Sequence, residues 1–486
     1  MAQAKGILPR RDDREVLYKN PRTAGYFIGV RLDAEIDCER ARAWLSLVSG
    51  LIDQLVAREP AARGGEKGEK VAAVAVGLAP GFFARNGQPR FDPPIEPPTC
   101  FATDAPLPNA AGPLAGVPLL DADVLFYVAS VYEARVNEFA SRLAQTRPDV
   151  QTLTLDRGYQ RLDETEPFGY RDGVRNVVPK DERAEVVFVH RDGKEPDEPA
   201  WADAGSYMAF LKILQRPDQF AALPDDNARD AIIGRRKDGT RLDTDQGADP
   251  AKEPAEPPPN LPPTSHVFKA GPRGAHDDTQ IFRRGLPFME GSPDGQLRVG
   301  LNFCSFQASL DQFDVVFNDW MVNPSFPPQA DGGQPGTDAL LDPARELTAV
   351  EKVGFFFVPP HHENGLAAAV FSAPPQRRQS ETGRLVVRKR VVDPSDPTRR
   401  FERRGFEFRV LDSQGQLVAG SEFTTDSTGR GVCPAELRRD DTYTLEEVVS
   451  PVANVQLQQT PFTVEKRVQQ LRVVNQVTQP NTPYGV

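Results

Sequence analysis

Residues 123–162, DVLFYVASVYEARVNEFASRLAQTRPDVQTLTLDRGYQRL, contain the pattern that decides the fold of the first part of the chain. The apolar run at 123–130 predicts a strand, and the amphipathic stretch at 132–143 predicts a helix. Residues 150–162 predict a second strand. The segment is therefore expected to form one strand–helix–strand unit.

A unit of the same kind precedes it. The runs GYFIGVRL at 25–32 and KVAAVAVGL at 70–78 predict strands, and apolar residues at helical spacing over 35–59 predict a helix between them. Two such units in succession are typical of a ferredoxin-like α+β fold. We predict this fold for residues of roughly 20–180.

A second ferredoxin-like half is predicted over roughly 200–372. Its expected elements are SYMAFLKIL (206–214), LRVGLNFCSFQASL (297–310), the helix-like DQFDVVFNDWM (311–321) and the closing strand VGFFFVPP (353–360). The polar, proline-rich residues 236–263 predict loops. Residues 1–372 are thus expected to form one α+β domain from two halves.

The chain changes character after Phe371. A linker-like stretch at 373–382 is followed by short alternating strands between turn residues over 383–477. This pattern predicts a small all-β sandwich of the prealbumin-like kind. The last residues, 478–486, predict a loose tail.

Composition excludes some partners. The chain has 486 residues, which favours more than one domain, and 39% of them are apolar. The 58 basic and 69 acidic residues give a net charge of −11, which opposes sequence-independent binding to nucleic acid or to an anionic membrane. No apolar stretch approaches the length of a membrane span.

Cysteines and the N-terminus bear on the compartment. The four cysteines are far apart and form no CxxC pair, so neither a zinc site nor a disulfide framework is expected. The arginine pair near the N-terminus precedes no apolar segment, so a signal peptide is not expected. A cytoplasmic location is the default expectation, and the C-terminal sandwich leaves an extracellular or compartment-associated location open.

Three separated segments contain residues suited to redox chemistry. They are EPFGYRDGVRN (166–176), SHVFKAGPR (265–273) and QIFRRGLPF (280–288), in a chain with only five histidines. Together and in this order they resemble motifs of the dye-decolourising (DyP-type) haem peroxidases, and the resemblance covers roughly residues 20–372. It implies one haem b per chain and reduction of hydrogen peroxide by organic donors such as dyes or phenolic compounds.

The resemblance assigns three principal residues. The family's proximal haem ligand falls on His266, and a neutral imidazole on one face of the iron leaves the other face open. Its distal aspartate falls on Asp172, which can move a proton between the peroxide oxygens. Its distal arginine falls on Arg283, with Arg284 as the alternative, and a guanidinium stabilises charge on the departing oxygen.

The resemblance also suggests supporting residues. Asn176 would order the distal loop, and Arg235 would meet a haem propionate. A carboxylate that polarises the proximal histidine is expected from Asp311 or Asp314, because such a partner raises the basicity of the imidazole.

Each of these residues, taken singly, also fits a structural role. The arginines could form a surface ion pair with Asp277 or Asp278, and Asp172 could cap a turn. A haem-binding or iron-handling protein without turnover is therefore one alternative, although it would need neither Asp172 nor Arg283. A structural or adhesive protein that uses the sandwich is another. Partners expected from the sequence include a second copy of the chain and a protein that binds the C-terminal domain.

The C-terminal segment has its own resemblance. Its order of strands and turns is similar to that of the SpaA-like or Cna B-type sandwich domains of surface proteins. The matching runs are GRLVVRK (383–389), GFEFRVLDSQGQLV (405–418), TTDSTGRG (424–431), YTLEEVVSP (443–451) and LRVVN (471–475).

Strand alternation predicts that three polar residues of this segment point inward. Lys389 shares the parity of the apolar residues in its strand, as do Glu447 and Asn475 in theirs. The family resemblance implies that the lysine and asparagine condense into an intramolecular isopeptide bond with help from the glutamate. The alternative is that Lys389 extends past its strand end to reach water while Asn475 caps the last strand.

Overall fold

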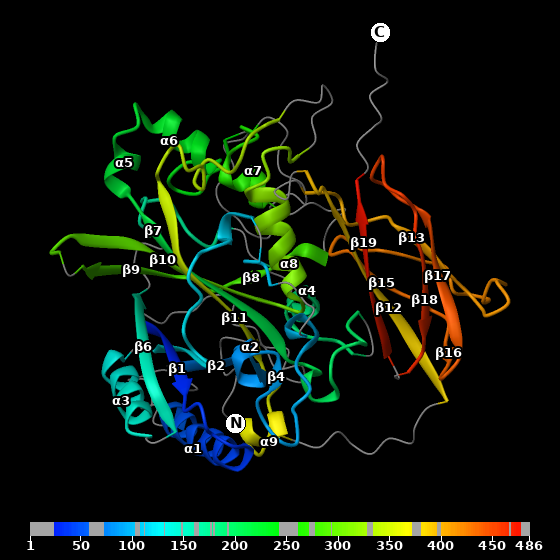
Figure 1. Cartoon of the computed structure of the whole chain (residues 1–486). Coiled ribbons are helices and arrows are strands. Elements are labelled where there is room, and N and C mark those ends of the chain that lie inside the picture. The colour runs from blue at the N-terminus through cyan, green and yellow to red at the C-terminus, as the bar shows by residue number, and fades with distance from the viewer. Residues whose placement is uncertain are drawn as a thin grey trace, which may run out of the picture.

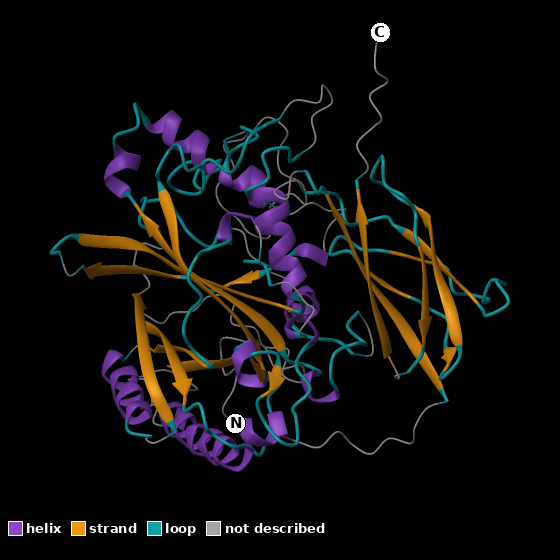
Figure 2. Cartoon of the chain, viewed as in Figure 1, coloured by secondary structure: helices purple, strands orange, loops and turns teal. Residues whose placement is uncertain are grey.

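The computed structural model describes most of the chain (Figure 1). The described residues are 24–57, 72–102, 107–110, 112–130, 132–146, 149–159, 165–174, 177, 180–191, 194–242, 261–271, 278–292, 294–327, 334–371, 381–395, 400–465 and 468–477. They form an α+β part and a separate β-sandwich that lies beside it (Figure 2).

The first half of the α+β part has four antiparallel strands in the order β6-β1-β5-β2. Its elements are β1 (Ala24–Leu32), α1 (Cys38–Ala57), β2 (Ala72–Leu78), β5 (Val124–Ser130), α3 (Glu133–Ala144) and β6 (Val150–Tyr159). Both α1 and α3 cross between strands and contact each other. This is the fourth-first-third-second strand order of a ferredoxin-like unit, so the predicted strand–helix–strand units are confirmed.

The second half repeats this order as β11-β7-β10-β8, and β9 also pairs with β10. Its elements are β7 (Ser206–Gln215), β8 (Phe282–Arg283), β9 (Leu286–Gly291), β10 (Leu297–Gln307), α8 (Leu310–Asp314), the π-helix η6 (Val315–Met321) and β11 (Thr348–Val358). We call the continuous segment 310–321 the α8–η6 helix.

The two halves join edge to edge into one nine-stranded sheet, because β11 pairs with β2 through Phe357 and Leu78. Gly77 permits this close approach. A Cβ atom built at Gly77 would lie 2.6 Å from Cβ of Phe356, which real side chains do not tolerate. The junction therefore requires the smallest residue at this position.

Short elements connect the strands. They are α2 (Pro80–Phe83), β3 (Ala84–Arg85), β4 (Gln88–Pro89), η1 (Thr99–Phe101), η2 (Gly112–Leu114), α4 (Lys180–Val187), η3 (Ala200–Ala202), α5 (Pro217–Ala221), α6 (Asp226–Ile233), α7 (His266–Ala270) and α9 (Leu366–Phe371). None of the helices in the described ranges is long and apolar enough to cross a membrane.

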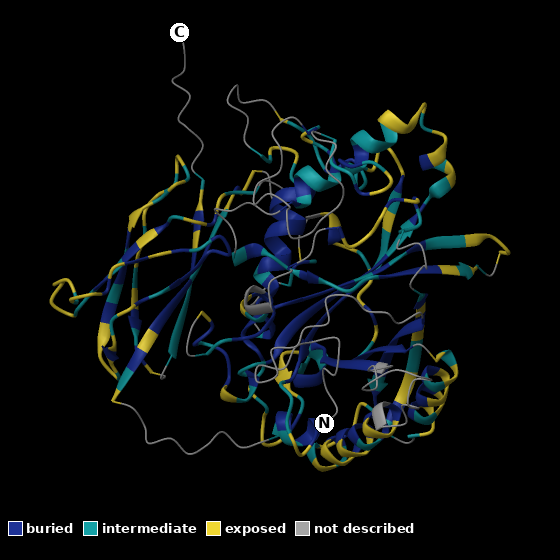
Figure 3. Ribbon diagram, turned by 180° about the vertical axis from the view of Figure 1, so that it is seen from behind, coloured by how far each residue is buried: buried dark blue, intermediate teal, exposed yellow. Residues whose placement is uncertain are grey.

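Strand alternation divides the core between the two faces of the sheet. In β1, Tyr26 and Ile28 belong to the core on one face, whereas Phe27 belongs to the core on the other. The first core also contains residues of α1, α3 and the α8–η6 helix, so these helices cover the same face. Figure 3 shows the buried residues concentrated along the sheet and this helix.

The C-terminal part consists of two four-stranded sheets around their own core. Its strands are β12 (Thr382–Val392), β13 (Glu407–Leu411), β14 (Phe423–Thr424), β15 (Arg430–Val432), β16 (Leu437–Arg438), β17 (Thr442–Val449), β18 (Gln459–Thr463) and β19 (Val468–Gln476). The first and last strands, β12 and β19, pair in parallel. The sheet of β12 faces the α8–η6 helix (Figure 1).

Candidate active site

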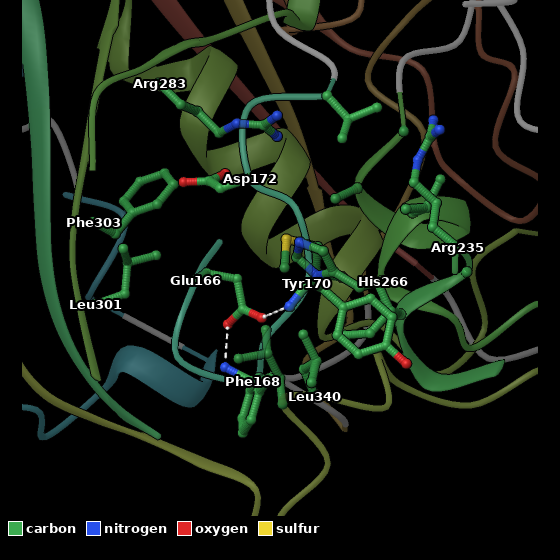
Figure 4. Close-up of a pocket in the computed structure, with 18 of the residues that line it drawn as sticks. Glu166, Phe168, Tyr170, Asp172, Arg235, His266, Arg283, Leu301, Phe303 and Leu340 are labelled. Carbon is green, nitrogen blue, oxygen red and sulfur yellow. Dashed lines mark hydrogen bonds between the residues drawn. The ribbon is translucent and has the colours of Figure 1, made fainter. Parts of the chain in front are cut away.

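A cavity of about 290 Å³ opens among β7, β10, the loop 166–174, α7 and the α8–η6 helix. Most of its wall is apolar, and the side chains that give it this character are Leu211, Ile213, Leu261, Leu301, Phe303, Phe313, Val316, Phe317, Met321 and Leu340. Its lining also includes His266, Asp172, Arg283, Arg235 and Glu166 (Figure 4). Residues far apart in the sequence therefore meet in one mostly apolar chamber.

His266 is the first residue of the short helix α7, whose N-cap is Ser265. Its ring nitrogen Nδ1 lies 2.8 Å from Oδ2 of Asp338, a carboxylate with 0% of its side chain exposed. An imidazole that donates Nδ1–H to a carboxylate keeps its unprotonated Nε2 for another partner. This geometry suits His266 to serve as a metal ligand toward the cavity.

Asp338 corrects a prediction from the sequence, which offered Asp311 or Asp314 as the carboxylate beside the histidine. Asp311 instead pairs with Arg388, and Asp314 pairs with Arg390 and Arg403. Both aspartates lie on the side of the α8–η6 helix that faces the sandwich. The prediction was wrong because neither residue faces the cavity.

The sequence contains little local signal for Asp338. It is 72 residues from His266 and follows α8–η6, to which its backbone N–H is tied by a 2.7 Å hydrogen bond to the carbonyl of Met321. Its Oδ1 accepts a hydrogen bond from the backbone of Leu340 at 2.9 Å. The carboxylate thus bridges its own turn and the histidine, and only the folded chain brings these together.

Asp172 and Arg283 both line the cavity, and in the view of Figure 4 they occupy a different part of its wall from His266. Asp172 lies between Gly169 and Gly173, whose φ angles of 85° and 69° require glycine. Its Oδ1 also accepts the backbone N–H of Gly173 at 2.6 Å, so it caps the turn as well as lining the cavity.

The structure distinguishes the two candidate arginines. Arg283 lies in β8 opposite Ser305 and lines the cavity. Arg284 is absent from the cavity lining, and its guanidinium lies 4.4 Å from the ring centre of Phe282. The backbone N–H of Arg284 donates to the carbonyl of Cys304 at 2.7 Å.

Glu166 holds the loop that carries Asp172, a role that the sequence reasoning missed. Its carboxylate accepts the backbone N–H groups of Phe168 at 3.0 Å and Tyr170 at 3.1 Å, and the amide of Gln215 at 2.9 Å. Burial raises the pKa of Glu166 to about 7, even though these hydrogen bonds favour its charged form. The available signal was its place at the start of a glycine-bounded turn.

The remaining predicted residues have different outcomes. Arg235 is buried, lines the cavity and donates to the carbonyl of Gly239 at 3.0 Å. Asn176 lies outside the described residues. Among the described residues, no group of three or more histidine, cysteine or acidic side chains is placed to hold a metal ion.

The sandwich contains the three polar residues predicted to point inward. Lys389, Glu447 and Asn475 are 1%, 3% and 0% exposed. Nζ of Lys389 lies 3.0 Å from Oε1 of Glu447, while Nδ2 of Asn475 donates to Oε2 of Glu447 at 2.7 Å. One buried carboxyl group therefore contacts both other residues, and the alternative in which Lys389 extends to water is wrong.

Burial changes the titration of this lysine. It lowers the pKa of Lys389 to about 8, although Glu447 opposes the shift. The ammonium also lies 4.8 Å from the ring centre of Phe406 and 5.9 Å from that of Phe408. A larger fraction of this lysine is therefore neutral at physiological pH than of an exposed lysine.

The α+β part thus consists of a single sheet built from two ferredoxin-like halves, with a histidine-containing cavity on one face. Residues 163–363 match the family model described as Dyp-type peroxidase, C-terminal. This segment, which contains the cavity motifs, is thus similar to the C-terminal part of DyP-type peroxidases.

Curated relatives match over part of their length. The chain is 26% identical over 210 residues to the multifunctional dye peroxidase DyP2 of Amycolatopsis sp., covering 35% of this chain and 44% of that protein. It is 24% identical over 258 residues to peroxidase 2 of Mycetinis scorodonius, covering 42% of this chain and 48% of that protein. The chain thus spans about half the length of these curated relatives.

Solved structures show the same fold for the α+β part. A DyP-type peroxidase from Streptomyces coelicolor aligns with a TM-score of 0.55 and 21% identity, covering 72% of this chain and 93% of that one. A DyP-type peroxidase from Cellulomonas bogoriensis aligns with a TM-score of 0.51 and 20% identity, covering 73% of this chain and 94% of that one.

Proposed function

We propose that this protein is a haem-dependent peroxidase that reduces hydrogen peroxide and oxidises organic donors such as dyes or phenolic compounds. The observation that carries the proposal is the composition of one cavity wall. It combines a histidine held by a buried carboxylate with an aspartate and an arginine from other elements. A protein that only stored or carried haem would need neither of the last two.

The residues present fit a haem group. The apolar wall suits a large planar macrocycle, and His266 offers Nε2 because Asp338 engages its Nδ1. Arg235 adds a cation to the lining that suits a propionate. When bound, haem supplies the redox-active iron at which peroxide is reduced while a donor is oxidised.

The protein residues have separate tasks in this proposal. His266 would hold the iron, and Asp338 orients the ring and raises its basicity by accepting the hydrogen bond from Nδ1–H. Asp172 would hold and move the proton that must pass between the two oxygens of peroxide. Arg283 would stabilise negative charge that develops on peroxide, since a guanidinium stays charged in an apolar site.

The decisive experiment is an absorption spectrum of purified, haem-reconstituted protein before and after one equivalent of peroxide, followed by addition of a dye. We expect a Soret band, a change in that band with peroxide, and its return as the dye is oxidised. A Soret band that peroxide leaves unchanged would instead favour the haem-carrying alternative. Absence of haem binding would reject both.

For the C-terminal part, we propose a SpaA-like or Cna B-type domain with an isopeptide bond between Lys389 and Asn475. The contacts of Glu447 with both residues support this second proposal. In the reaction, neutral Nζ of Lys389 attacks Cγ of Asn475, an amide bond forms, and the side-chain nitrogen leaves as ammonia. Glu447 moves the protons between the two nitrogens.

Intact-mass measurement tests the bond directly. The wild-type chain should be lighter than its sequence by the mass of one ammonia, and Lys389→Ala should carry the full sequence mass. Glu447→Gln should also carry the full mass, because the group that moves the protons is absent. A wild-type mass equal to that of the sequence would reject the proposal.

A further inference from the structure

The α8–η6 helix has two functional faces. Phe313, Val316 and Phe317 line the cavity, whereas Asp311, Asp314 and Asp319 face away from it toward the sandwich. All three aspartates contact arginines of the sandwich. The helix thus separates the cavity from the C-terminal part of the chain.

Two of these aspartates are joined by Arg403, which is 7% exposed. Its Nε lies 2.7 Å from Oδ2 of Asp319, and its Nη2 lies 2.6 Å from Oδ2 of Asp314. Nη2 of Arg390 reaches the same oxygen of Asp314 at 2.9 Å. A planar guanidinium donates along two directions at once, which suits Arg403 to join two acidic residues of one helix.

A second group of contacts extends this interface. Arg430 lies 2.5 Å from Oδ1 of Asp197, and Arg388 lies 3.3 Å from Oδ2 of the same residue while also pairing with Asp311. The side chain of Asp197 is 3% exposed. These ion pairs are removed from water, so salt screens them much less than surface pairs.

Strand parity explains why the arginines face the helix. Lys389 points into the sandwich core, so its neighbours Arg388 and Arg390 must point outward from β12. The three consecutive residues Arg-Lys-Arg therefore place a buried lysine on one face of β12 and two cations on the other. The strand that carries the proposed cross-link is also a docking strand.

The aspartates of the α8–η6 helix and the arginines of the sandwich have opposite charges, and each stabilises the charged form of the other. Burial alone would raise the pKa of Asp314, but Arg403 and Arg390 outweigh it and hold the pKa below its ordinary value. Removal of one partner from such a buried pair leaves an uncompensated charge, which is strongly unfavourable. Separation of the sandwich from the helix is thus expected to break several ion pairs at once.

We propose that the sandwich is an intramolecular brace whose docking arginines, Arg388, Arg390 and Arg403, fix the α8–η6 helix and so the wall of the cavity, while Arg430 holds the neighbouring loop through Asp197. The partner of this sandwich face is the peroxidase part of the same chain. The docking arginines are positioning residues, since none of them lines the cavity. This inference concerns packing and does not depend on the chemistry proposed for the cavity.

Hydrogen exchange of the full chain, measured by mass spectrometry without added haem, tests the brace. Arg403→Gln should accelerate amide exchange in residues 310–321 on the order of tenfold or more, because the helix loses its buried partner. Arg409→Gln is the matched control, since Arg409 pairs with Glu446 within the sandwich. Unchanged exchange in 310–321 of the Arg403 variant would overturn the proposal.

A second variant separates lost docking from an unfolded sandwich. Exchange in β13 and β17 reports on the sandwich itself and should stay as in the wild type. If Arg403→Gln also exposes these strands, the double variant Arg403→Gln/Asp319→Asn decides, because it leaves neither of these two charges. Faster exchange confined to 310–321 in the double variant supports the brace, and wild-type exchange there rejects it.

Discussion

Replacement of both Lys389 and Glu447 gives the sharpest test of how the sandwich is held together. Lys389→Met/Glu447→Gln removes the buried charges but keeps similar volumes, and methionine suits the apolar space beside Phe406 and Phe408. If the wild type contained only an ion pair, this exchange would be roughly neutral or stabilising. If it contains the isopeptide bond, the variant loses a cross-link as well.

The size of that loss follows from the positions of the two linked residues. The bond would close a loop of about 86 residues between the first and last strands, which corresponds to ~4.6 kcal/mol in the chain-entropy description of cross-links. We therefore expect the free energy of unfolding of the sandwich to fall by roughly 4–5 kcal/mol in the double variant. Glu446→Gln, which changes the adjacent carboxylate on β17, should leave it nearly unchanged.

The assay must report on the sandwich alone. All three tryptophans, Trp44, Trp201 and Trp320, belong to the α+β part, so intrinsic tryptophan fluorescence reports on the sandwich only indirectly, through Trp320 of the docked α8–η6 helix. Pulse proteolysis in increasing urea, with fragments identified by mass, measures the fraction of folded sandwich directly. A double variant as stable as the wild type would refute the cross-link, whatever the outcome for the peroxidase site.

The remaining predictions concern the cavity. His266→Ala should lose haem affinity, as measured by titration of the Soret band. Asp338→Asn should weaken that affinity or the activity by about 10–100-fold, because the histidine loses its orienting partner. Haem titrations like those of the wild type in both variants would contradict the proximal assignment. Asp172→Asn and Arg283→Leu should bind haem normally, yet at least one should slow the reaction with peroxide by about 10²-fold or more in stopped-flow mixing. Rates of reaction with peroxide equal to the wild-type rate in both variants would reject the distal site. Glu166 has a native pKa of about 7 against an ordinary value of 4.5. Between these pH values the native state holds a proton that the unfolded chain has released. The free energy of unfolding therefore decreases as the pH rises through this range, by at most about 3 kcal/mol. Glu166→Gln should flatten this part of the curve of unfolding free energy against pH, and an unchanged slope would exclude Glu166 as its source.

Docking of the sandwich on the α+β part gives the C-terminal part a role that the sequence analysis did not predict. The sequence predicts a domain available to another protein, whereas Arg403 and Arg430 of the structure are buried against the same chain. In the sequence, these arginines cannot be distinguished from ordinary charged residues at the surface. A partner for the opposite sheet of the sandwich stays a prediction.

The sequence by itself determined the features that depend on local periodicity. Apolar runs predicted the strands of both halves, and alternation predicted the inward direction of Lys389, because side chains of a strand alternate between two faces wherever the strand lies. The resemblance of three short motifs to those of DyP-type peroxidases implied His266, Asp172 and Arg283, and all three line one cavity. These features needed no knowledge of how distant segments pack.

Only the tertiary structure decided which residues became partners. Asp311 and Asp314 were reasonable candidates for the histidine, but the rotation of the α8–η6 helix turns them toward the sandwich and leaves that place to Asp338. The side of a buried helix that faces a cavity depends on every element packed around the helix. An amphipathic pattern shows that a helix has a polar side and an apolar side, but it does not identify the element that packs against each side. Local sequence therefore specified the direction of each side chain relative to its own element, while the packing of distant elements specified what it contacts.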